Sequence, residues 1–225
     1  MKEVQKVFIP GEITTREHCH DRVESFVKHA ANPIFKVERP WEGQGTSHPT
    51  VLFDDEENIF KMWYECVGPP LASLGVTGTG KVVDNWEVRD NHWYLCYATS
   101  ADGIHWDRPA LNRIHAKEHP DNNITHMDSG FIGGSGTVML DRNDPDPKRR
   151  YKLLLYDNDG KGGDGARSYV SPNGIDWEPL GPFPVLPSQD AMACWFDERR
   201  GRYVALLKTR LNNLRARMIS VSEDF

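Results

Sequence analysis

The chain has 225 residues, 38% of them hydrophobic and 10% aromatic, and a net charge of −6 at pH 7. This aromatic content suits a core built between the faces of β-sheets. The acidic balance and the lack of a long basic run predict no nucleic-acid partner. The N-terminus has no apolar signal core and no stretch reaches the length of a membrane span, which predicts a cytoplasmic protein with no membrane partner.

Residues 1–47 are predicted to be an N-terminal extension, with a helix over residues 15–28 that carries apolar positions on one side. From residue 48 the chain repeats one strand plan. A short apolar strand ends in an acidic turn, and an aromatic residue opens the next strand. The strand pairs are 50–53 with 60–65, 137–140 with 151–156, and 193–196 with 203–208.

A recurring phrase follows the third strand of each copy. We call residues 97–106, their second copy 169–177 and the partial third copy 219–225 the blade phrase. Asp102-Gly103 and Asn173-Gly174 are turn pairs that tolerate positive φ, so the phrase is interpreted as a structural turn. Trp106 and Trp177 are expected to begin a fourth strand and to pack between neighbouring sheets.

Repetition of one supersecondary unit at uneven intervals favours a β-propeller over a helical solenoid. The predicted fold is therefore all-β, with four-stranded antiparallel blades. Residues 48–225 are expected to form a partial β-propeller. Its predicted blades are residues 48–110, 133–180 and 189–225.

Several pieces resemble the five-bladed β-propeller glycosidase superfamily, which includes glycoside hydrolase families 32 and 43. The matching pieces are 32–33, 48–55 with 61–64, 100–106, 122–124, 144–147 with 150–152, and Asp190 with 197 and 201–203. The resemblance implies about two and a half blades of an expected five. It therefore implies the N-terminal portion of a longer protein, whose open sheet face and edge would favour oligomerisation.

Strand topology predicts where chemistry can sit. In an antiparallel blade, the start of strand one and the end of strand two share one rim, and the blade phrase lies on the opposite rim. Strand one begins near His48, Ser135 and Asp190, and strand two ends near Glu65, Asp157 and Arg210. The link 110–134 lies over the same rim, and loop 67–90 is a candidate lid.

Glycoside hydrolysis uses two carboxyl groups. The resemblance places catalytic carboxylates at the start of strand one, so Asp190 is the first candidate. Glu65 is the candidate proton donor. Asp157 or Asp128 would orient the substrate or adjust the pKa of a catalytic carboxyl. Where the resembling families carry an aspartate in the first blade, this chain has His48. The candidate substrate-binding residues are His48, Trp63, Asp128, Trp195 and Arg210.

Neither cysteines nor histidines are spaced as metal ligands. The four cysteines lack CxxC spacing and are expected to be free buried thiols. His115, His119 and His126 with Asp128 match no structural zinc site. No cofactor and no metal ligand is therefore predicted, although the resemblance leaves room for a structural calcium ion in the funnel.

The sequence thus predicts a glycoside hydrolase-like protein that acts on an oligo- or polysaccharide through carboxylate acid/base chemistry. Two alternatives stay open. A glycoside phosphorylase would use the rim cations His48, Lys208 and Arg210 to bind phosphate. A non-catalytic propeller would only bind carbohydrate.

Overall fold

The computed structural model describes residues 27–43, 45–68, 92–114, 116, 118–127, 136–158 and 164–225. The chain divides into two compact units, Met1–Asn32 and Pro33–Phe225, and every strand within these ranges belongs to the second. Nearly all of the helix predicted over residues 15–28, and most of the lid predicted over residues 67–90, lie outside the described residues. Among the residues described, no helix combines the length and apolar content needed to cross a membrane.

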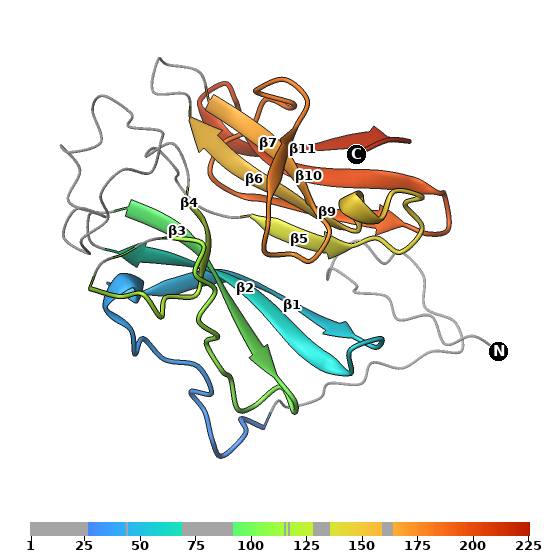
Figure 1. Ribbon diagram of the computed structural model, residues 1–225. Coiled ribbons are helices and arrows are strands. Elements are labelled where there is room, and N and C mark those ends of the chain that lie inside the picture. Colours follow the sequence, from blue (N-terminus) through green and yellow to red (C-terminus); the bar gives the residue numbers. More distant parts are fainter. Residues whose placement is uncertain are drawn as a thin grey trace, which may run out of the picture. The chain divides into compact units, whose positions relative to one another are not determined.

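The second unit is all-β, as predicted, and its strands form three antiparallel sheets (Figure 1). The first sheet contains β1 (Thr46–Asp54), β2 (Ile59–Gly68), β3 (His92–Ser100) and β4 (Ile124–Met127). The second contains β5 (Thr137–Leu140), β6 (Tyr151–Asn158), β7 (Asp164–Ser171) and β8 (Glu178–Leu180). The third contains β9 (Met192–Asp197), β10 (Arg202–Leu211) and β11 (Leu214–Ser222). The described residues also include the 3-10 turns η1 (Pro40–Glu42) and η4 (Pro147–Arg149), which lie outside the sheets.

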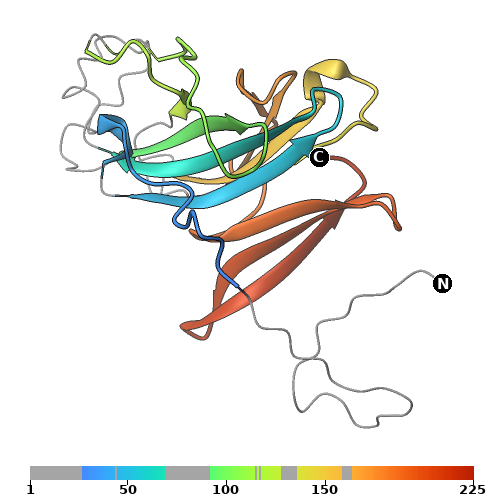
Figure 2. The ribbon, with the colours of Figure 1, turned by 90° about the horizontal axis from the view of Figure 1, so that it is seen from below.

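The sheets pack on one another in chain order because the second sheet is apolar on both faces (Figure 2). Alternate residues of a strand face opposite sides of its sheet. Leu153 and Leu155 of β6 therefore join the core with the first sheet, while Leu154 joins the core with the third. The innermost strand of the second sheet, β5, contacts both β1 and β9. The N–H of Val138 donates to Thr50 Oγ1 at 3.2 Å, which links β5 to β1. This arrangement is that of successive propeller blades.

The blade phrase is a structural turn, as predicted. Ser100 Oγ accepts a hydrogen bond from the N–H of Gly103 at 2.9 Å, and Asp102 Oδ1 accepts from the next two amides at 2.8 Å each. In the second copy, Ser171 and Asn173 make the same contacts. The side chains replace water as partners of the turn amides, so this conformation follows from local sequence.

The fourth strand of the first sheet differs from the prediction. In the second sheet, β8 follows Trp177 directly, as expected. After Trp106, however, only Asp107 bridges to the sheet, through Thr99, and β4 comes later in the chain. The chain leaves the sheet edge here because Arg108 forms an ion pair with Glu42, in which Arg108 Nε lies 2.7 Å from Glu42 Oε1. Glu42 is fully buried, so this ion pair holds the segment over the outer face of the first sheet.

A buried ionic cluster joins consecutive sheets at the end that carries the blade phrase. Lys61 Nζ donates to Asp54 at 2.9 Å and to the Tyr151 hydroxyl, from the next sheet, at 3.0 Å. Burial raises the pKa of Asp54, but hydrogen bonds from Lys61 and Tyr151 outweigh it and hold that pKa well below its ordinary value. The second and third sheets repeat this cluster. Its members there are Asp141, Lys152 and Tyr203.

Candidate functional site

The predicted rim exists as one end of the three sheets. We call it the axial rim: the end at which β1, β5 and β9 begin and β2, β6 and β10 finish. The strand register places Ser47 opposite Glu65 at this end, whereas Phe60 lies opposite Ser100 at the other. The blade phrase and the ionic clusters therefore lie away from the axial rim, and the candidate carboxylates lie on it.

His48 and Glu65 are brought together by an irregularity in β1. The register shifts between Ser47 and Thr50, and His48 has a φ of +46°. A bulge can redirect a side chain, and a non-glycine residue at positive φ is strained, a combination found often at functional sites. The Nδ1 atom of His48 lies 3.0 Å from Glu65 Oε2. His48 is half-exposed, so the pair reaches from solvent into the sheet interface.

Glu65 is held from both sides. It is 3% exposed, and its Oε1 atom accepts a hydrogen bond from the N–H of Gly136 at 2.6 Å. Gly136 directly precedes β5, so the second sheet supplies this contact. A carboxyl fixed by a backbone amide on one oxygen and a histidine on the other is restricted to one orientation, as acid/base chemistry requires.

Asp157 lies at the same interface, on the opposing sheet. Asp157 is 1% exposed and lies on the face of β6 that packs against the first sheet. Glu65 lies on the face of β2 that packs against the second sheet, so both carboxylates belong to this interface. Its Oδ2 atom is 2.5 Å from Nε of Arg167, whose guanidinium stacks on the Phe183 ring at 4.1 Å. This ion pair fixes the orientation of the Asp157 carboxyl.

Asp190 is more open than Glu65 or Asp157. It is 56% exposed and forms an ion pair with Lys208, which is mostly buried. The charge of Asp190 also acts on Tyr156 of β6, in the second sheet. Burial, a hydrogen bond to Asp164, and the charges of Asp164, Asp190 and Asp157 together raise the pKa of Tyr156 to about 12. Three carboxylates, those of Asp157, Asp164 and Asp190, therefore act on Tyr156 at the axial rim.

The aromatic candidates differ from each other. Trp63 was predicted to stack on a sugar ring, but it is 1% exposed, and its indole N–H donates to the carbonyl of Gly174 at 2.6 Å. Trp63 therefore fills the core between the first two sheets and presents no ring face to a ligand. Trp195 is 43% exposed on β9, and Arg210 is exposed near the end of β10. Both remain candidates for substrate binding.

The predicted histidine group is not visible as a unit. Asp128 and His115 lie outside the described residues, as does the side chain of His126, and His119 packs beside Trp41 at 5.6 Å. In the described ranges, no three His, Cys, Asp or Glu side chains are arranged to hold a metal ion.

The strand register also places on the rim one residue that sequence reasoning did not single out, Tyr156. Glu65, Tyr156 and Lys208 occupy equivalent places in β2, β6 and β10, five residues after the aromatic that opens each strand. Asp157 and Arg210 stand one and two places further along their strands. Aligning the three strands on Phe60, Tyr151 and Tyr203 would have identified this row. Arg167 gave no signal, because its partner comes from a neighbouring strand.

No protein-family model and no curated protein matches the chain. Solved structures do match. An N-acetylgalactosamine deacetylase from F. plautii, in complex with blood group B trisaccharide, has a TM-score of 0.54 at 13% identity, covering 86% of this chain and 53% of its own. A glycosyl hydrolase from Bacteroides ovatus has a TM-score of 0.53 at 13% identity, with 88% and 55% covered.

A third match belongs to work on the GH130 family of mannoside phosphorylases, which contains glycoside hydrolases that target β-1,2 mannosidic linkages in Candida mannan. It has a TM-score of 0.50 at 15% identity, with 88% and 55% covered. The chain thus spans about half the length of the structures it matches. At this identity the similarity concerns the fold. The chain has the fold of the propeller-like glycosidases, as the blade phrase and strand plan predicted.

Proposed function

We propose that the axial rim is part of the active site of a glycoside hydrolase-like enzyme. The observation that carries the proposal is the fixed Glu65 carboxyl, held between the amide of Gly136 and the imidazole of His48. His48 connects Glu65 with solvent, because its Nδ1 atom contacts Glu65 Oε2 and its ring is half-exposed. Glu65 is therefore the proposed proton donor to the leaving sugar oxygen.

Hydrolysis needs a second carboxylate that stays ionised. Asp190 and Asp157 are the two candidates on the axial rim, and they pair with Lys208 and Arg167 respectively. We assign Asp190 the role of base or nucleophile, since it is the more exposed of the two carboxylates. Asp157 is almost fully buried, and we assign it the role of adjusting the electrostatic environment of Glu65. The similarity in fold to a glycosyl hydrolase supports a carbohydrate substrate.

The test is turnover of a panel of nitrophenyl glycosides and oligosaccharides by the full-length protein. We expect Glu65→Gln and Asp190→Asn each to lower kcat at least about 100-fold, because acid/base groups contribute about that much or more. Asp176→Asn is the matched control: Asp176 is a half-exposed carboxylate paired with Arg113 in the blade phrase, away from the axial rim. If Glu65→Gln and Asp190→Asn both turn over substrate as fast as the unmodified protein, the catalytic roles assigned to Glu65 and Asp190 are wrong.

A glycoside phosphorylase remains the second candidate, favoured by two cations on the rim, Lys208 and Arg167, and by the similarity in fold to a GH130 structure. Adding inorganic phosphate to the same assay separates the two reactions, because only a phosphorylase then releases a sugar phosphate. Glycan binding without turnover under either condition would indicate the third function, a non-catalytic carbohydrate-binding propeller.

A further inference from the structure

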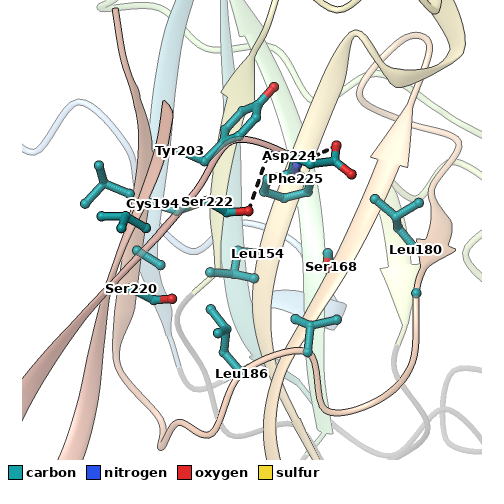
Figure 3. A pocket seen from close by; sticks show the side chains of 15 residues that line it. Leu154, Ser168, Leu180, Leu186, Cys194, Tyr203, Ser220, Ser222, Asp224 and Phe225 are labelled. Atoms are coloured by element: carbon teal, nitrogen blue, oxygen red, sulfur yellow. Dashed lines mark hydrogen bonds between the residues drawn. The ribbon is translucent and has the colours of Figure 1, made fainter. Parts of the chain in front are cut away.

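The three copies of the blade phrase differ at one chemically reactive position. In each copy, the N–H two residues after a serine donates to the Oγ of that serine at 3.3 Å, and Figure 3 shows this contact for Ser222 and Asp224. The donating residue is Asp102 in the first copy, Asp224 in the third and Asn173 in the second. Gly174 follows Asn173 and makes the only Asn-Gly pair in the sequence. The second copy therefore carries a dipeptide that can change its own covalent structure.

An asparagine followed by glycine can lose its side-chain amide without an added reagent other than water. The backbone nitrogen of Gly174 gives up its proton and forms a bond with Cγ of Asn173. The amide nitrogen of Asn173 takes up a proton and leaves the same carbon as ammonia, which produces a five-membered succinimide ring. Water then opens the ring at one carbonyl to give aspartate, or at the other to give isoaspartate. Glycine favours ring closure because it has no Cβ to obstruct it.

The folded phrase holds both reacting groups in other hydrogen bonds. The N–H of Gly174 donates to Ser171 Oγ at 2.9 Å, so the proton that has to leave is held in place. The Asn173 Oδ1 atom accepts from the amides of Ile175 and Asp176 at 2.9 Å each, and its Nδ2 donates to Asp176 Oδ2 at 2.8 Å. Ring closure has to rotate the carboxamide out of these three contacts. The native turn therefore opposes the reaction.

The first sheet keeps the second phrase in this conformation. The indole N–H of Trp63 donates to the carbonyl of Gly174 at 2.6 Å, and the Trp63 ring packs against the Gly174 backbone. Arg113, in the link 110–134, holds both carboxylate oxygens of Asp176. Local opening of a structure costs more free energy where such contacts have to break. The phrase must therefore separate from the first sheet before Asn173 can react.

We propose that Asn173 is a conditional deamidation site. It stays intact while the second blade phrase is docked on the first sheet, and it is modified when the phrase undocks. The interface that the phrase closes is the one that contains Glu65 and Asp157 at its other end. Deamidation therefore records the opening of this interface as a covalent change.

The modification also opposes redocking. Aspartate suits the first copy, because Asp102 Oδ2 lies 2.7 Å from Nδ1 of His105. In the second copy the residue at the place of His105 is Asp176, so an aspartate at position 173 would set two carboxylates against each other where Asn173 now donates a hydrogen bond. Isoaspartate lengthens the backbone by one methylene group and does not fit the turn. A phrase that has reacted is therefore not expected to regain its native contacts.

The test follows deamidation of Asn173 in the 225-residue protein by peptide mass spectrometry, in a mildly alkaline buffer with and without urea. We expect the native protein to react at least about tenfold more slowly than the protein in urea, which corresponds to an opening cost of at least about 1.4 kcal/mol. Ser171→Ala frees the N–H of Gly174 and should speed the native reaction about fivefold, the factor that corresponds to one hydrogen bond of about 1 kcal/mol. Ser100→Ala is the matched control, because Ser100 makes the same contact in the first copy, and it should leave the rate at Asn173 unchanged.

A second measurement concerns the product. Asn173→Asp should lower the melting temperature, because it sets a carboxylate against Asp176. Adding Asp176→Asn should restore most of the loss, because the exchanged pair again has one amide and one carboxylate.

Thermal melting of each variant establishes that it is folded. If Ser171→Ala does not fold, Trp63→Phe replaces it, because it removes the indole N–H that holds the Gly174 carbonyl. The proposal is overturned if Asn173 reacts as fast in the native protein as in urea, or if it stays intact in urea. It is also overturned if Ser171→Ala reacts no faster than Ser100→Ala, or if Asn173→Asp melts like the unmodified protein. None of these outcomes depends on carbohydrate turnover at the axial rim.

Discussion

Replacing Lys152 with methionine is expected to destabilise the protein by about 3–5 kcal/mol, because it leaves buried carboxylates without their cation. Lys152 is fully buried, and its Nζ lies 2.9 Å from Asp141 and 2.7 Å from Asp144. Methionine keeps much of the volume and loses only the charge and its hydrogen bonds. Urea unfolding followed by tryptophan fluorescence measures the difference.

The same variant should alter the dependence of stability on pH. Burial raises the pKa of Asp141 and of Asp144, but hydrogen bonds from Tyr203 and Lys152 to the first, and from Lys152 to the second, outweigh it, so both values lie below the ordinary range. A lowered carboxyl pKa contributes stability above the unfolded value of about 3.9, and this stability is lost as the pH falls through the folded value. The unmodified protein should therefore lose stability below about pH 4 more steeply than Lys152→Met.

Lys148→Met is the control for this experiment. Lys148 is exposed in η4, close in sequence to the same cluster, and its replacement should change stability by no more than about 0.5 kcal/mol. Equal effects of the two substitutions would mean that the buried cluster does not stabilise the packing of the second sheet on the third.

Gly174→Ala is expected to cost about 3 kcal/mol or more, and Gly103→Ala only about 1–2 kcal/mol. Both glycines have a φ of +74°, so alanine is strained equally at either site. The surroundings differ: a Cβ at Gly174 would lie 2.5 Å from Trp63 Cζ2, whereas the nearest atom to one at Gly103 is 3.7 Å away, in Phe60. The difference between the two variants therefore reports mainly the contact with Trp63, with a smaller part from Tyr151 Cδ1 at 3.2 Å.

A double-mutant cycle identifies that contact. Trp63→Leu copies the residue that stands at this place in the second sheet, and it should remove the clash. The combined variant is then expected to be more stable than the sum of the two single changes, by about 1 kcal/mol or more. Additive effects, or equal costs at the two glycines, would contradict the packing of the second blade phrase on the first sheet.

Local sequence was sufficient for much of this protein. The alternation of apolar residues and the acidic turns located the strands around Val51, Val138 and Ala193, and the turn pair Asp102-Gly103 gave the conformation of the blade phrase. These features depend on contacts within a few residues, so the chain carries them wherever it folds. Strand direction then placed Glu65, Asp157 and Asp190 on one rim.

Tertiary structure decided which side chains meet, because their partners come from other sheets. Trp63 could have been a sugar platform, but Gly174, distant in sequence, buries it in the core. The bulge that turns His48 toward Glu65 depends on how β1 pairs with β2. Asp141 and Lys152 of the second sheet likewise meet Tyr203 of the third sheet in a buried cluster, and packing of that kind has no local pattern in the sequence.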